Sequence, residues 1–200
     1  MDRKPRLSTL VLDIVKIVIP RNSLVVLCGP AGCGKSTFAA NHFLPTQVVS
    51  SDDCRAQLSD DATNQEITAF AFQLMHFIVE RRLWLRRLTV ADATNLKRED
   101  RRPMIELAKR FGFNLAAIVF NVSLDICLTR NARRARTIPD DAIVAQHSLV
   151  QPTLASIKRE GFHYVFVLDD KHQGLADIEV GSIVRRYRTG QPRGRHEDDS

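Results

Sequence analysis

The sequence predicts a doubly wound α/β fold with a mainly parallel sheet. Three observations lead to this prediction: short apolar runs alternate with helix-compatible segments, residues 115–122 are apolar apart from Asn121, and a glycine-rich turn joins residues 24–28 to a helix-compatible segment. Inner strands of a parallel sheet are covered by helices on both faces, so they are apolar along their whole length. Strands that alternate with helices are typical of a parallel sheet with crossover helices.

The first half of the chain contains three predicted strands and a long predicted helix. The strands are residues 16–19 and 24–28, with Pro20 in the turn between them, and residues 47–49. Residues 67–88 carry apolar side chains at helical spacing, which predicts an amphipathic helix. Its aromatic residues are expected to belong to the core and not to form a surface on which other rings stack.

The second half continues this alternation. Residues 88–91 are a predicted strand, Gly112 closes one predicted helix and Ser123 caps another. The remaining predicted elements are strands over residues 115–122 and 164–168, and helices over residues 99–111, from 123 through 130, from 139 onward and over 175–187.

Length and composition predict one folded domain. The chain has 200 residues, of which 44% are hydrophobic and 26% charged, as in ordinary soluble proteins. We divide it into an N-terminal extension over residues 1–15, a folded domain over 16–187 and a disordered polar tail over 188–200. It shows no signal-peptide pattern, and no apolar run approaches the roughly 18 residues that span a bilayer, so a cytoplasmic protein without membrane contact is expected.

Charge and cysteine usage narrow the partners. The net charge is +6 and arginines occur in clusters, which favours polyanionic partners because the guanidinium group binds phosphate with a planar fork. Solvated helix faces would explain the same clusters. The four cysteines show no Cys-x-x-Cys pairing, so reduced and non-ligating thiols are expected.

A phosphate-binding motif is the most informative part of the chain. The pattern Gly-x4-Gly-Lys-Ser lies between a predicted strand and a predicted helix. Glycines let the backbone wrap an anion with its N–H groups at the positive end of the helix. Lys35 is expected to reach the β- and γ-phosphates of ATP, and the Ser36 hydroxyl to bind Mg²⁺. The predicted loop consists of Gly29, Pro30, Ala31, Gly32, Cys33, Gly34, Lys35, Ser36 and Thr37.

Cys33 lies inside this loop at the start of a predicted helix. Such a position can lower the pKa of a thiol and make it oxidisable, which is a side hypothesis for this cysteine.

Acidic residues follow two further predicted strands. Asp52 comes after residues 47–49 and Asp92 after residues 88–91. Because ligands of open α/β sheets bind beyond the carboxyl ends of the strands, both acids are expected to face the phosphate loop, one near the metal and one near the incoming nucleophile. Arg55 lies three residues after Asp52, so a short helix would project both the same way, as in an acceptor site.

Two arginines are predicted to complete the site from a lid. Arg130 and Arg134 are four residues apart, hence on one face if both belong to one helix, where they could close over a transferring phosphoryl group. An exposed basic helix is the alternative. The Asn-Lys-x-Asp motif of GTPases and the Leu-Ser-Gly-Gly motif of transporters are absent from the sequence, which leaves phosphotransferases with an arginine-rich lid.

Four motifs, in order and at compatible spacings, resemble the kinase module of bacterial polynucleotide kinase/phosphatases, a family of P-loop polynucleotide 5′-hydroxyl kinases. The similarity covers residues 16–168 and identifies residues 16–187 as a P-loop kinase domain. The motifs are Gly29-Pro-Ala-Gly-Cys-Gly-Lys-Ser-Thr-Phe-Ala39, Val49-Ser-Ser-Asp-Asp-Cys-Arg55, Asp92-Ala-Thr-Asn95 and Asn121-Val-Ser-Leu-Asp-Ile-Cys-Leu-Thr-Arg-Asn-Ala-Arg-Arg134.

The resemblance implies transfer of the γ-phosphate of ATP to the 5′-hydroxyl of DNA or RNA in end healing or repair. It makes Lys35 and Ser36 the phosphate- and Mg²⁺-binding pair, Asp52 the general base and Arg55 the clamp on an acceptor phosphate. Arg130 and Arg134 match the lid arginines on the donor phosphates. Asp92 and Asn95 are motif residues, with Asp92 expected to hold the metal through a bound water.

The chain departs from this family because no phosphatase or ligase-like domain follows the kinase module. A separate phosphatase or ligase protein is therefore an expected partner, beside 5′-OH DNA or RNA ends. Two alternatives stay open: a small-molecule or nucleoside kinase on the same scaffold, and a non-catalytic ATP-binding adaptor. The basic surface and Arg55 favour an acceptor that carries phosphates, whereas a proton acceptor and a lid have no use in an adaptor.

Overall fold

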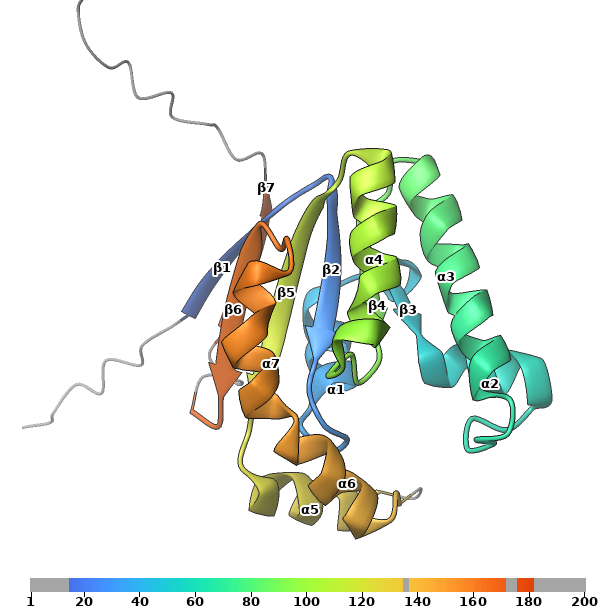
Figure 1. Cartoon of the computed structure of the whole chain (residues 1–200), viewed down its shortest axis with the longest axis vertical. Coiled ribbons are helices and arrows are strands. Elements are labelled where there is room, and N and C mark those ends of the chain that lie inside the picture. The colour runs from blue at the N-terminus through green and yellow to red at the C-terminus, as the bar shows by residue number, and fades with distance from the viewer. Residues whose placement is uncertain (1–14, 135–136, 172–175, 182–200) are drawn as a thin grey trace, which may run out of the picture.

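The computed structural model describes residues 15–134, 137–171 and 176–181 of the chain, and its centre is a five-stranded parallel sheet (Figure 1). The strand order is β3-β4-β2-β5-β6. The strands are β2 (Ser23–Cys28), β3 (Val48–Ser50), β4 (Thr89–Asp92), β5 (Asn114–Asn121) and β6 (Tyr164–Asp169). The doubly wound α/β prediction is confirmed.

Helices cover both faces of this sheet because successive residues of each strand point to opposite sides. Along β2, Val26 packs with α3 and α4, whereas Val25 and Leu27 pack with α1 and α5. The helices are α1 (Lys35–His42), α2 (Ser51–Ser59), α3 (Thr68–Trp84), α4 (Arg98–Phe111), α5 (Leu124–Ala132), α6 (Asp140–Ser148) and α7 (Val150–Ser156), with 3-10 turns η1 (Pro45–Gln47) and η2 (Ile157–Arg159).

A second, two-stranded parallel sheet pairs β1 (Val15–Pro20) with β7 (Ala176–Gly181). The predicted helix over 175–187 is therefore wrong for residues 176–181, and residues 182–187 lie outside the described chain. The physical reason is that buried and exposed side chains alternate here with the two-residue period of a strand. Ile178 packs on the core, whereas Asp177 and Glu179 are exposed. Glu179 also forms a 2.6 Å ion pair with Lys16 across the two strands.

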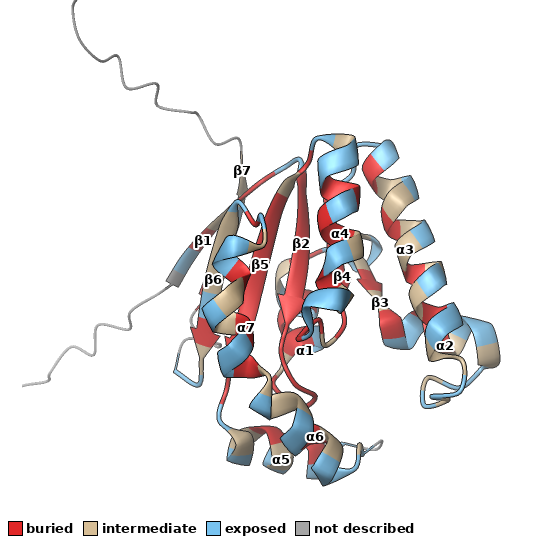
Figure 2. Ribbon diagram, in the orientation of Figure 1, coloured by how far each residue is buried: buried red, intermediate tan, exposed pale blue. Residues whose placement is uncertain are grey.

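The long helix predicted over 67–88 is confirmed as α3, which ends at Trp84. The expectation that its aromatic residues belong to the core is wrong for Phe70, Phe77 and Trp84, which are exposed. Small and aliphatic side chains cover the sheet instead, because the buried face of α3 consists of Ala71, Met75, Val79 and Leu83. Figure 2 shows the buried residues along one side of α3 and exposed ones along the other.

Within the described part of the chain, no helix is long and apolar enough to cross a membrane. The N-terminal extension predicted for residues 1–15 and the tail predicted for 188–200 lie almost wholly outside the described residues, which begin at residue 15.

Candidate active site

The predicted phosphate loop joins β2 to α1, as its strand–helix context indicated. Gly32 and Gly34 have φ values of 78° and 99°, in the left-handed region that favours glycine. A Cβ on Gly32 would also collide with the backbone carbonyl of Cys127, and one on Gly29 would lie 2.7 Å from the Cys33 sulfur. The close packing of the loop therefore requires glycine at these positions.

Lys35 is the first residue of α1, and its side chain turns back over the loop. Its ammonium group donates hydrogen bonds of 2.9 Å to the carbonyl oxygens of Gly29 and Pro30. Lys35 is only 9% exposed, so its charge lies inside the loop, where an anion held by the backbone N–H groups would meet it.

Asp92, at the end of β4, lies near the Lys35 ammonium and the Ser36 hydroxyl. Burial raises the pKa of Asp92, and the nearby Lys35 ammonium and the Ser36 hydroxyl oppose that effect. A hydroxyl and a carboxylate oxygen side by side are oxygen donors of the type that Mg²⁺ prefers, so Ser36 and Asp92 fit this ion.

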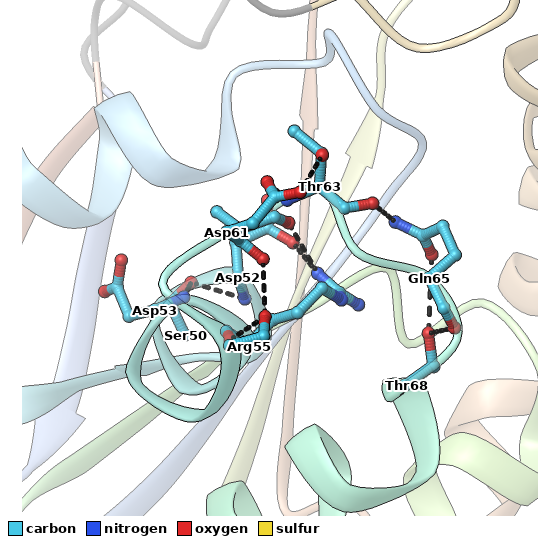
Figure 3. Close-up of polar contacts among 10 residues, drawn as sticks. Ser50, Asp52, Asp53, Arg55, Asp61, Thr63, Gln65 and Thr68 are labelled. Carbon is cyan, nitrogen blue, oxygen red and sulfur yellow. Dashed lines mark hydrogen bonds and ion pairs between the residues drawn. The ribbon is translucent and has the colours of Figure 1, made fainter.

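Asp52 and Arg55 lie on α2, whose N-terminus is capped by Ser50. The Ser50 hydroxyl accepts hydrogen bonds from the backbone N–H groups of Asp52 and Asp53. One turn later, the Arg55 guanidinium donates a 2.6 Å hydrogen bond to the Asp52 carboxylate (Figure 3). In the same view Asp53 points away from Arg55. The predicted same-side projection of Asp52 and Arg55 is confirmed.

Arg55 is almost completely buried, with 5% of its side chain exposed. Besides Asp52, its guanidinium contacts the carbonyl oxygen of Ala62 at 3.3 Å, and its Nε has no hydrogen-bond partner among the described residues. A buried donor without a partner is costly, so this atom favours an incoming anionic group.

The phosphate loop, both acids and Arg55 line one cleft of about 230 Å³. They meet because the strand order places β3, β4 and β2 side by side, so the loops after these strands share one edge of the sheet. The residues that line this cleft include Lys35, Ser36, Asp52, Arg55, Asp92, Arg134 and Gln146.

A second cavity of about 390 Å³ lies on the α1 side of the loop. Arg134 lines both cavities, whereas Arg130 lines only the second and donates a 3.3 Å hydrogen bond to the Cys33 carbonyl oxygen. The prediction that both arginines share one helix face is wrong, because α5 ends at Ala132 and Arg134 lies in the turn after it. The two side chains nevertheless meet at the second cavity.

Two of the motif residues have structural surroundings that the sequence did not indicate. Asn95 is buried at φ 47° and donates a 2.9 Å hydrogen bond to the Leu27 carbonyl oxygen, which ties the loop after β4 to β2. Cys33 is fully buried, and burial raises the pKa of its thiol, so the hypothesis of a lowered thiol pKa is wrong.

Sequence reasoning missed Gln146 on α6. Its side-chain carbonyl accepts a 2.8 Å hydrogen bond from the backbone N–H of Ala31 in the phosphate loop. The contact spans 115 residues of sequence and belongs to no motif, so no local pattern could reveal it. Gln146 connects the α6 segment directly to the loop.

Comparisons with known proteins identify a family and a shared fold. A family model described as AAA domain matches residues 24–153. The chain is similar to a chain of the Pnkp1/Rnl/Hen1 RNA repair complex, with 23% identity and a TM-score of 0.59 over 69% of this chain and 47% of that one. It is also similar to a candidate kinase from Chloroflexus aurantiacus, with 16% identity and a TM-score of 0.53 over 78% of this chain and 90% of that one.

Both likenesses show a shared α/β fold. The chain spans about half the length of its relative in the RNA repair complex, since it covers 47% of it.

Proposed function

This chain belongs to the AAA_33 family of AAA domains, and from this premise we propose that it is an ATP-dependent polynucleotide 5′-hydroxyl kinase. The enzyme moves the γ-phosphate of ATP to the 5′-OH end of DNA or RNA. One observation carries the proposal: a single cleft is lined both by the phosphate loop with Lys35 and by the Asp52–Arg55 pair. That arrangement suits a donor phosphate and an acceptor alcohol in contact.

In this proposal, the phosphate loop and the second cavity bind ATP, the phosphate donor. Lys35 neutralises charge on the β- and γ-phosphates, and Ser36 with Asp92 would hold Mg²⁺. When bound, Mg²⁺ supplies positive charge to the phosphate oxygens. Arg130 and Arg134 line the cavity on the α1 side, which we assign to the rest of the nucleotide, while Arg134 also reaches the cleft where transfer occurs.

In this proposal, residues of α2 bind and activate the acceptor, which is the 5′-hydroxyl end of the nucleic acid. The Asp52 carboxylate takes the proton from the 5′-hydroxyl, whose oxygen attacks the γ-phosphorus as the bond to the bridging β–γ oxygen breaks and ADP leaves. Arg55 binds an acceptor phosphate with the guanidinium atoms that Asp52 does not occupy. A substrate that brings its own phosphate would therefore loosen the Asp52–Arg55 ion pair and free the carboxylate to act as base.

A polynucleotide acceptor is supported by charge and by the sequence resemblance. The net charge of +6 and a pI near 9.5 favour a polyanion. The fold shared with a chain of an RNA repair complex adds a context of end healing, in which a separate phosphatase or ligase would be a partner. We expect the protein to act in the cytoplasm.

A small-molecule or nucleoside kinase is the second candidate, because the cleft is small. Its volume of about 230 Å³ is below the range usual for ligand pockets, so a compact acceptor would also fit.

Phosphate transfer from labelled ATP tests the proposal. Purified protein should label a 5′-OH oligonucleotide and leave a 5′-phosphorylated one of the same sequence unlabelled, since only the first offers the nucleophile. The Lys35→Ala variant is the background control. Transfer to a free nucleoside at equal kcat/KM would support the second candidate, and ATP binding without any transfer would support an adaptor; either result rejects the proposal.

A further inference from the structure

The outer face of α3 carries an apolar stripe that is left mostly exposed in the described chain. The Arg81 guanidinium of the same helix lies 5.2 Å from the centroid of the Phe77 ring. Phe70, Phe77 and Trp84 are 61%, 56% and 65% exposed, and they lie opposite the buried face of the helix. They are spaced seven residues apart, so they line up along the helix about 10 Å from one another. We call these three residues the α3 stripe. Large exposed apolar patches on a folded domain mark interaction surfaces.

The α3 stripe is symmetric about its middle residue. Phe70 precedes Phe77 by as many residues as Trp84 follows it. If a second copy of the helix is turned end over end about Phe77, the two Phe77 rings meet and each Phe70 lies opposite the Trp84 of the other copy. Such a self-complementary patch is what a two-fold symmetric dimer requires.

Charge selects the antiparallel arrangement. Glu80 is the only acid between Thr68 and Trp84. The end of α3 and the turn after it are basic through exposed Arg81 and Arg87, whereas exposed Glu66 precedes the start of the helix. An antiparallel pair brings Glu66 of each copy toward the arginines of the other. A parallel pair would place arginines against arginines, which like-charge repulsion disfavours.

A groove beside the stripe offers room for side chains of a second copy. It has a volume of about 340 Å³, lies between α3 and α4, and is lined by Phe77 together with Gln73, His76, Pro103 and Leu107. Its acids do not oppose association, because Arg110 pairs with Glu80 and Arg102 pairs with Glu106. Ridges of one helix fit grooves beside another in helix packing.

We propose that the α3 stripe is a self-association surface through which two copies of this chain form an antiparallel, two-fold symmetric dimer. The contact is small: a helix about 25 Å long and 10 Å wide buries roughly 500 Å² in total, less than the ~1,000 Å² of a stable interface. Association should therefore be reversible and depend on protein concentration. This inference does not depend on the proposed kinase activity.

Sedimentation velocity over about a hundredfold range of protein concentration in the micromolar region tests the inference. The weight-average mass of the wild-type chain should rise from 22.6 kDa toward twice that value. Phe77→Asp should remain monomeric, while Val144→Asp, a change at a 46% exposed residue of α6, should associate like the wild type. A wild type that stays monomeric throughout, or Phe77→Asp that associates unchanged, would overturn the proposal.

Cysteine cross-linking tests the antiparallel orientation of the two α3 helices and does not introduce a charge into the α3 stripe. The four native cysteines are buried, so an introduced surface cysteine dominates the reaction. Phe70→Cys and Trp84→Cys chains, one of them carrying a mass tag, are mixed and oxidised with a mild copper oxidant. The antiparallel dimer predicts the mixed disulfide as the main product. Self-linked products of each variant alone, or none above the level of Val144→Cys, would reject it.

Discussion

At the scale of single residues, the two members of the Asp52–Arg55 ion pair differ in how far they are exposed to solvent. The Asp52 carboxylate is 56% exposed and lines the cleft, whereas the Arg55 guanidinium is buried and its Nε has no partner in the described part of the chain. The exposed carboxylate is accessible to an acceptor hydroxyl, and the buried guanidinium is held in place by Ala62 as well. The base and the clamp therefore differ in how firmly the fold positions them.

This difference yields a prediction for Asp52. Asp52→Asn removes the proton acceptor but keeps an oxygen that can bind Arg55, so kcat for phosphate transfer should fall by about 10²- to 10⁴-fold while the Kd for ATP changes little. Transfer assays and nucleotide titration measure the two quantities. Asp53→Asn is the matched control, because Asp53 is next to Asp52 in the sequence but its carboxylate points away from Arg55. A comparable loss in the control, or loss of ATP binding with Asp52→Asn, would contradict the role of base.

At the scale of elements, the segment from α5 to α6 contacts the phosphate loop from two directions. Arg130 of α5 donates to the Cys33 carbonyl oxygen, and Gln146 of α6 accepts from the Ala31 N–H. Arg134 lies in the turn between these helices and borders both cavities. The predicted lid therefore includes α5 and α6, each hydrogen-bonded to the phosphate loop, and Arg134, which lines the cleft.

The two lid arginines should differ in their kinetic effects. Arg134→Ala removes a charge beside the transferring group and should lower kcat by about 10³-fold. Arg130→Ala removes a contact on the α1 side only and should mainly raise KM for ATP, by roughly tenfold. Steady-state kinetics separate these outcomes. Arg133→Ala, at an exposed arginine that lines neither cavity, should behave like the wild type; equal losses in all three variants would refute the assignment.

At the scale of the whole molecule, a buried ion pair joins distant parts of the chain behind the cleft. Arg101 of α4 binds Glu160 at 2.6 Å, and their side chains are 1% and 3% exposed. Arg101 also donates hydrogen bonds to the carbonyl oxygens of Asn95 and Leu96. Thr153 of α7 donates to the Leu96 carbonyl oxygen as well. The loop that begins at Asp92 is therefore fixed by residues from α4 and α7.

Glu160→Gln should destabilise the fold by roughly 3–5 kcal/mol at pH 7, because it leaves the buried Arg101 charge without a counterion. Burial acts to raise the pKa of Glu160, but hydrogen bonds from Arg101 and Ser156 outweigh it, and the pKa lies below its usual 4.5. A lowered pKa means that the ionised carboxylate stabilises the fold above about pH 4.5, and that this stability is lost as the pH falls through the folded-state pKa.

Urea denaturation of Glu160→Gln and the wild type should therefore differ most near neutral pH and converge in acid. Glu106→Gln is the control, because the Arg102–Glu106 pair is 78% and 58% exposed and should contribute less than about 1 kcal/mol. Similar effects of both substitutions, or a difference that does not shrink in acid, would contradict this account.

The sequence by itself determined the features that are encoded between near neighbours. The phosphate loop was recognisable because its glycines, lysine and serine are contiguous and lie between an apolar run and a helix. Asp52 and Arg55 share one helical turn, so their common direction followed from spacing alone. The parallel sheet followed from strands that are apolar along nearly their whole length, such as residues 115–122.

Only the tertiary structure decided what depends on distant parts of the chain. The strand order brought Asp52 and Asp92 to one cleft, and α6 placed Gln146 on the phosphate loop across 115 residues. Local patterns also misled where tertiary packing prevails: residues 176–181 form a strand because β1 pairs with them, and Phe77 is exposed because aliphatic residues of α3 cover the sheet. The periodicity of apolar residues predicts which side chains share one face of an element. Which other element packs against that face depends on the tertiary structure.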